Sequence, residues 1–156
     1  MKKTVLLFTF AVAVILVGAL PASASCATYL CGGQNVTTCG TTGADSITGH
    51  TGVDVIASRE GNDTLNGFYG NDKICGMADS DSAIGHYGND VVAGQNGNDT
   101  HVGGSYENDN VYGGSGNDTL AGDLIQSNSG TDFVDGGSGT DTCYSGETYV
   151  NCETIN

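Results

Sequence analysis

Aspartates recur along this sequence at a nearly constant interval, and their carboxylates are the side chains best suited to chemistry. Seven follow one another every nine residues, two more follow after a shift of one residue, and the last two come after a longer gap. Oxygen ligands repeated in this way can bind hard divalent cations. Eleven of the fourteen aspartates belong to the series and are the candidate metal ligands: Asp45, Asp54, Asp63, Asp72, Asp81, Asp90, Asp99, Asp109, Asp118, Asp132 and Asp141.

Each aspartate stands at the sixth place of a glycine-rich unit of nine residues. The clearest copies are residues 113–121 (GGSGNDTLA) and 136–144 (GGSGTDTCY). Glycines at the first and fourth places permit positive φ, so the first six residues predict a turn and the last three a short strand. One side chain per unit, at the eighth place, would form the core: Ile47, Ile56, Leu65, Ile74, Ala83, Val92, His101, Val111, Leu120, Val134 and Cys143. So thin a core requires the units to stack.

The unit resembles the G-G-x-G-x-D-x-U-x sequence of the repeats-in-toxin (RTX) calcium-binding family, where U is a large apolar residue. The resemblance covers residues 40–144, about eleven nonapeptides. It implies an all-β fold, a right-handed parallel β-roll solenoid. It also implies that calcium lies between neighbouring turns, bound by aspartate side chains and by carbonyl oxygens of both turns.

Electrostatics independently favours a cation in such a roll. Two units make one coil of 18 residues, so aspartates 18 apart, such as Asp54 and Asp72, would stack at about the 4.8 Å spacing of β-strands. At about 5 Å two carboxylates repel by about 0.8 kcal/mol in water and by about 3 kcal/mol at an effective dielectric constant of 20. Calcium accepts six to eight oxygen ligands in flexible geometry, whereas magnesium demands a tight octahedron. We therefore predict calcium; the alternatives are a metal-free solenoid and a disordered acidic tail.

The number of calcium sites depends on the regularity of the units. Eleven units provide nine neighbouring pairs on the same side of the roll. Three units are irregular: residues 76–84 carry Asp79 in place of the fourth glycine, residues 103–112 have one extra residue, and residues 122–135 have five. Five pairs avoid these units, so we expect about five good sites and up to nine.

Ala83 and His101 are the two weak side chains among the core positions. They are 18 residues apart and would therefore lie in adjacent coils of one sheet. A shift of one residue turns a strand over. The sequence thus suggests that both strands shift and bury the following residues, Ile84 and Val102.

The first 24 residues have the pattern of a signal peptide. Two lysines precede an apolar run, and Ala22-Ser23-Ala24 provides a small-residue cleavage site. An uncleaved membrane anchor is the alternative, with a run just short of a spanning helix. Cleavage would leave Arg59 and Lys73 against 18 acidic residues, a net charge near −16. Such a surface disfavours nucleic acid and anionic membranes as partners.

The six cysteines all follow the predicted cleavage site, and an even number in an exported chain indicates disulfides. Zinc is disfavoured because no CxxC pair occurs. We expect Cys143 and Cys152 to pair and to close the roll with a capping strand in residues 145–156. Residues 25–39 would form an amino-terminal cap, in which the pairing of Cys26, Cys31, Cys39 and Cys75 remains open.

No catalytic motif occurs outside the repeats. The sequence contains no phosphate-binding glycine loop with lysine, no G-x-S-x-G and no H-E-x-x-H. The prediction is therefore a secreted, extracellular calcium-binding structural or binding module that is not an enzyme. The alternative is an adhesin that recognises a polysaccharide, ice or another surface through an outer face of the roll. A regular ladder of threonine or aromatic side chains on one face would favour that alternative.

Overall fold

The computed structural model describes residues 30–123 and 130–156. The predicted signal peptide, residues 1–24, and Cys26 lie outside this part of the chain. No helix within the described ranges is long and apolar enough to cross a membrane.

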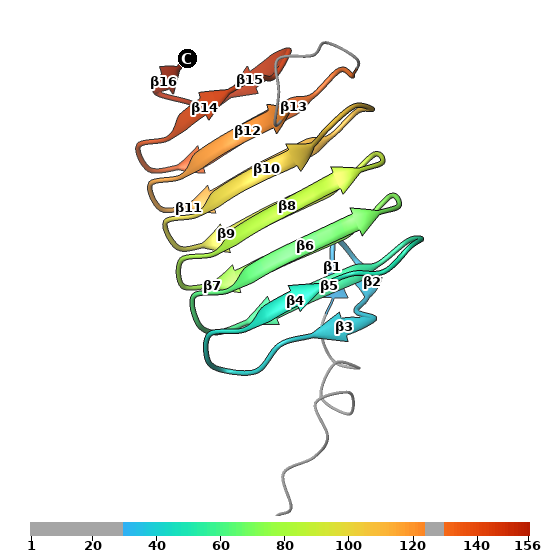
Figure 1. Cartoon of the computed structure of the whole chain (residues 1–156). Coiled ribbons are helices and arrows are strands. Elements are labelled where there is room, and N and C mark those ends of the chain that lie inside the picture. Colours follow the sequence, from blue (N-terminus) through green and yellow to red (C-terminus); the bar gives the residue numbers. More distant parts are fainter. Residues whose placement is uncertain (1–29, 124–129) are drawn as a thin grey trace, which may run out of the picture.

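Two parallel sheets of seven strands each make up most of the molecule (Figure 1). The even sheet contains, in spatial order, β4 (Ser46–Thr48), β6 (Thr64–Tyr69), β8 (Ser82–Tyr87), β10 (Thr100–Gly104), β12 (Thr119–Asp123), β14 (Thr142–Tyr144) and β16 (Thr154–Ile155). The odd sheet contains β3 (Thr38–Cys39), β5 (Val55–Arg59), β7 (Lys73–Ala78), β9 (Val91–Asn96), β11 (Asn110–Ser115), β13 (Phe133–Ser138) and β15 (Thr148–Val150).

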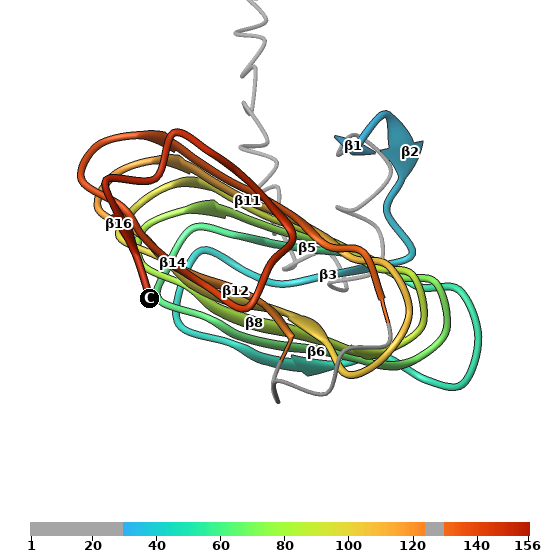
Figure 2. The same cartoon turned by 90° about the horizontal axis from the view of Figure 1, so that it is seen from above.

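The chain alternates between the two sheets, so each strand pairs with the strand one coil later. Leu65 on β6 is level with Ala83 on β8, and Ile56 on β5 is level with Ile74 on β7. Seen from above, the coils lie over one another as a flattened ring (Figure 2). The predicted all-β parallel β-solenoid is confirmed, with about six turns. Its right-handed sense stays a prediction.

The irregular units keep this register. Val92 is level with Val111 across a separation of 19 residues, and Val111 is level with Val134 across 23. The extra residues therefore fall between the strands in the sequence, and the strands themselves stay in register.

The eighth-place side chains form the core between the sheets. Ile56, Leu65 and Ile74 belong to one buried apolar cluster, and Val111 and Leu120 belong to a second. Between these clusters lies the fully buried His101, level with Ala83 on one side and Leu120 on the other.

The predicted strand shift at this point is wrong. Ala83 and His101 are buried, whereas Ile84 and Val102 are only half-buried on the outer face. The aspartates explain the register, because the Asp99 N–H donates to the Asp118 carboxylate one coil later. A one-residue shift would break this bond, so the turns hold His101 inward despite its polarity.

We expect His101→Leu to stabilise the fold. Both ring nitrogens of His101 are buried without a hydrogen-bond partner, and burial lowers the pKa of the ring to about 4, so it is neutral at pH 7. Leaving buried polar groups unsatisfied costs about 1–3 kcal/mol, and leucine has a similar volume. The free energy of unfolding, measured by urea denaturation, should rise by about 1–3 kcal/mol, while the exposed His50→Leu should give no gain. A lower midpoint for His101→Leu would argue against an unsatisfied ring.

The amino-terminal segment covers the outer side of the odd sheet. Its strands β1 (Leu30–Cys31) and β2 (Gln34–Asn35) form an antiparallel hairpin that lies outside the ring (Figure 2). Cys31 and Val36 pack there against Val55, Ala57 and Cys75 in a small apolar cluster. A disulfide joins Cys31 to Cys75, with Cα atoms 5.8 Å apart. Cys39 is also disulfide-bonded.

The carboxyl-terminal segment adds one further coil. The predicted Cys143–Cys152 disulfide is confirmed. The sequence suggested a single returning strand, but the structure has two: β15 extends the odd sheet beside β13, and β16 extends the even sheet beside β14. The segment therefore caps both sheets, because a chain of this length can complete one more circuit of the roll.

Candidate metal sites

The eleven sequence-predicted aspartates lie in two columns, one on each side of the roll. Each aspartate ends a turn and immediately precedes a strand. The even column leads into the even sheet and consists of Asp45, Asp63, Asp81, Asp99, Asp118 and Asp141. The odd column leads into the odd sheet and consists of Asp54, Asp72, Asp90, Asp109 and Asp132.

One carboxylate oxygen of each aspartate ties neighbouring coils together. The Asp54 N–H donates to Asp72 Oδ1 at 2.8 Å, and the Asp72 N–H donates to Asp90 Oδ1 at 2.8 Å. The same bond recurs in every neighbouring pair of both columns, at 2.7 to 2.9 Å. It continues through the irregular units, from Asp90 to Asp109 and from Asp109 to Asp132.

The other oxygen, Oδ2, is left without a partner in nine of the aspartates. These nine side chains are buried, and no donor reaches Oδ2: Asp63, Asp72, Asp81, Asp90, Asp99, Asp109, Asp118, Asp132 and Asp141. The first member of each column differs, because Asp45 Oδ2 accepts the Thr41 N–H and Asp54 Oδ2 accepts the His50 N–H. A buried carboxylate oxygen with no partner is costly, so a ligand is expected to satisfy it.

The first glycine of a unit leaves the space into which Oδ2 points. A Cβ on Gly67 would lie 2.5 Å from Asp72 Oδ2 and 2.7 Å from the carbonyl oxygen of Gly85, in the next coil. Both oxygens therefore face one small space against the Gly67 Cα. Gly70 is the fourth-place glycine and has φ of 139°; a Cβ on it would clash with the carbonyl oxygen of Gly52. Side chains at these places would push the coils apart.

The donor set fits a calcium ion that is bound partly by the backbone. Within the described ranges no three His, Cys, Asp or Glu side chains converge on one point. Carboxylates alone would therefore not complete a site. Carbonyl oxygens of the turns are the other donors beside Oδ2, and calcium readily combines carboxylate and carbonyl ligands. Zinc sites need nitrogen or sulfur ligands, which are absent from the described parts of the columns.

Negative charge on the buried aspartates in the middle of the odd column is disfavoured without a cation. Burial raises the pKa of Asp90 to about 7, and the neighbouring charge of Asp72 adds to the rise. Burial also raises the pKa of Asp109 to about 8, helped by the charges of Asp90 and Asp132. The backbone hydrogen bond that each carboxylate accepts lowers the pKa but does not outweigh burial. Without a metal ion, Asp90 and Asp109 therefore hold protons near neutral pH.

Two glutamates outside the repeat also join the columns. The Asp132 N–H donates to Glu147 Oε2 and the Asp141 N–H donates to Glu153 Oε2, both at 2.6 Å. Sequence reasoning missed them because they follow those aspartates by 15 and 12 residues. Neither separation belongs to the nonapeptide frame, so no periodic signal marked them.

The model of the RTX calcium-binding nonapeptide repeat matches four copies, at residues 40–65, 66–100, 104–124 and 121–147. No curated protein and no solved structure is significantly similar to the chain. The four copies cover more than half of the 156 residues and contain every aspartate of both columns. The match over more than half of the chain agrees with the parallel solenoid and the stacked aspartates of the structure, and the chain therefore belongs to the RTX calcium-binding nonapeptide repeat family.

Proposed function

We propose that this protein is a secreted calcium-binding module whose roll is stabilised by calcium between same-side turns. The carrying observation is the set of nine buried aspartate Oδ2 atoms without a partner, stacked in two columns. A cation in each gap between repeats would satisfy the seven of these oxygens from Asp63 to Asp118, and would cancel the repulsion along the column. The eleven aspartates of the columns are the proposed side-chain ligands, and turn carbonyls complete each site.

The geometry supports nine sites among the repeats, more than the five that regularity alone suggested. The Asp-to-Asp hydrogen bond is present at each of the nine neighbouring pairs, including those that involve irregular units. The pairs separated by 19 or 23 residues keep this bond just as the pairs separated by 18 do. We therefore propose one calcium ion for each pair.

We also propose that the protein is secreted and that its role is binding or structural, without catalysis. RTX repeats and disulfides are typical of proteins outside the cell, and the acidic chain would meet enough calcium there to fold. The family model that matches is a repeat module, and the perturbed carboxylates all lie within or beside the columns. These observations support binding or a structural role over catalysis.

Calcium removal tests the proposal directly. The chain without residues 1–24, with disulfides intact, is expected to show a β-type circular dichroism spectrum in millimolar calcium. In excess EDTA it should lose part of that signal and melt at a lower temperature. Isothermal titration should then report binding of several ions, while magnesium at equal concentration should restore little structure. A β spectrum that is identical in calcium and in EDTA would defeat the proposal.

A second candidate, recognition of a polysaccharide, is favoured by one observation. Tyr69 and Tyr87 stack with ring centroids 4.9 Å apart, and Tyr106 continues the stack at 6.3 Å; all three are exposed. This is an aromatic ladder of the kind that recognition would need, although stacking leaves mainly ring edges and hydroxyls accessible. A polysaccharide pull-down should then depend on Tyr87; retention that Tyr87→Ala does not change would exclude this surface.

A further inference from the structure

The carboxyl-terminal coil, residues 145–156, lies outside the nonapeptide frame but reproduces the turn contacts of the repeats. In the repeats, each aspartate N–H donates to the carboxylate one coil later. Here Glu147 accepts from Asp132 and Glu153 accepts from Asp141. Glutamate side chains are one methylene longer, which lets this shorter coil reach the same backbone groups. Both columns therefore end on a carboxylate of this coil.

The spaces below this coil resemble those between repeats. A Cβ on Gly122 would lie 2.6 Å from Asp132 Oδ2 and 2.5 Å from the carbonyl oxygen of Ser145. A Cβ on Gly136 would lie 2.7 Å from Asp141 Oδ2 and would also clash with the carbonyl oxygen of Asn151. At Gly67 the corresponding oxygens belong to Asp72 and to Gly85, the first glycine of the unit in the next coil. The carbonyls of Ser145 and Asn151 therefore occupy the position that the Gly85 carbonyl has there.

Buried oxygens point into both spaces without a partner. Asp132 is 1% exposed and Asp141 is 0% exposed, and Oδ2 of each lacks a hydrogen bond. Asp123, 7% exposed, adds a third unpartnered oxygen, Oδ1, and its charge interacts with that of Glu147. The last space of each column therefore contains an unsatisfied carboxylate oxygen, as the spaces between regular repeats do.

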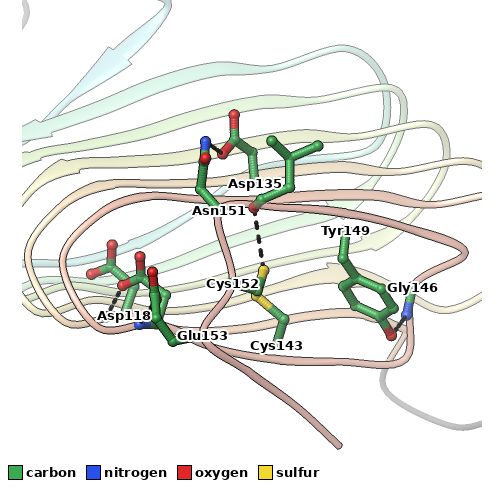
Figure 3. Close-up of a disulfide and its surroundings, with 10 residues drawn as sticks. Asp118, Asp135, Cys143, Gly146, Tyr149, Asn151, Cys152 and Glu153 are labelled. Carbon is green, nitrogen blue, oxygen red and sulfur yellow. Dashed lines mark hydrogen bonds between the residues drawn. A yellow bond between two sulfur atoms is a disulfide. The ribbon is translucent and has the colours of Figure 1, made fainter.

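Local contacts fix the coil in position. The Cys143–Cys152 disulfide holds it against β14 immediately before Glu153 (Figure 3). The Gly146 N–H donates to the Tyr149 hydroxyl at 2.6 Å beside Glu147, and Asn151 Nδ2 donates to Asp135 Oδ1 at 2.9 Å. Both glutamates are thus presented by a constrained segment, as a preformed ligand set requires.

We propose that Glu147 and Glu153 complete two further calcium sites, one at the carboxyl-terminal end of each column. Glu147 would act with Asp132 and the Ser145 carbonyl. Glu153 would act with Asp141 and the Asn151 carbonyl. This inference rests on the proposed calcium function, and it raises the number of ions from nine to eleven.

Native mass spectrometry of the calcium-loaded, disulfide-intact protein tests it by counting ions. The wild type should bind eleven calcium ions and Glu147→Gln with Glu153→Gln should bind nine. Glutamine keeps an oxygen that accepts the aspartate N–H, so the coil should remain folded. The exposed Glu60→Gln makes a matched control for loss of one acidic charge and should leave the number unchanged.

Each single variant should bind one ion fewer, which keeps the test decisive if the double variant does not fold. The same number of ions in the wild type and in both single variants would overturn the inference while leaving the nine repeat sites intact. A wild type that binds no calcium would instead overturn the proposed function itself. The two failures are therefore distinguishable.

Discussion

Asp90→Asn is expected to lower the melting temperature of the calcium-loaded protein strongly and to leave that of the metal-free protein equal or higher. Asparagine can still accept the Asp72 N–H, which donates to Asp90 Oδ1 at 2.8 Å. The charge that would bind calcium in the spaces on either side is lost. At a calcium concentration 100 times Kd, each lost site removes about 2.7 kcal/mol of stability. Without calcium the substitution only replaces a buried carboxyl group whose ionisation burial already disfavours.

Thermal melts followed by circular dichroism, in calcium and in EDTA, measure this difference. Asp79→Asn is the matched control because Asp79 is exposed, stands at a fourth place with φ of 71°, and accepts only the Gly61 N–H. It should change either melting temperature little, since asparagine also tolerates positive φ. An equal loss for Asp90→Asn in calcium and in EDTA would assign Asp90 a purely structural role.

The metal-free protein is expected to lose stability as the pH rises from 5 to 8, opposite to ordinary acid denaturation. Burial raises the pKa of Asp81 and of Asp90 to about 7 and that of Asp109 to about 8. In the unfolded chain these groups release their protons near pH 4. Between pH 4 and 8 the folded form therefore binds more protons than the unfolded form, and stability falls as the pH rises.

Calcium should reverse this trend because it replaces the protons. Urea midpoints measured in EDTA should fall from pH 5 to pH 8, whereas midpoints in saturating calcium should rise over the same range. Asp109→Asn should flatten the EDTA profile between pH 6 and 8, and Asp79→Asn should not. EDTA midpoints that increase with pH would show that the column carboxylates do not hold protons in the folded state.

Much of the site could be predicted because its geometry is local to the nonapeptide. Gly67 and Gly70 shape a turn, Asp72 follows it, and Ile74 points inward from the next strand, all within one unit. Repeating that unit every nine residues leaves few ways to bury the apolar side chain except by stacking. The positions of the aspartates in columns follow from the period alone.

The strand register at His101 was not predictable from the period. Hydrophobicity favoured burying Val102, but the hydrogen bonds that join Asp99 to Asp81 and to Asp118 in the neighbouring coils oppose that choice. Such a bond joins residues 18 or 19 apart and exists only where two coils lie against each other. Polarity at one core position is therefore tolerated where the turn contacts on both sides are satisfied.

By itself the sequence determined the unit, the two-sheet solenoid, both aspartate columns and the Cys143–Cys152 pair, because each depends on residues that are close in the chain or regularly spaced. Only the tertiary structure decided the Cys31–Cys75 pair, the orientation of His101 and the entry of Glu147 and Glu153 into the columns. These depend on where one coil comes to lie on another. The physical reason is that the position of the non-repeating coil, residues 145–156, is set by its pairing with the sheets beside it. The spacing of residues within that coil does not predict this pairing.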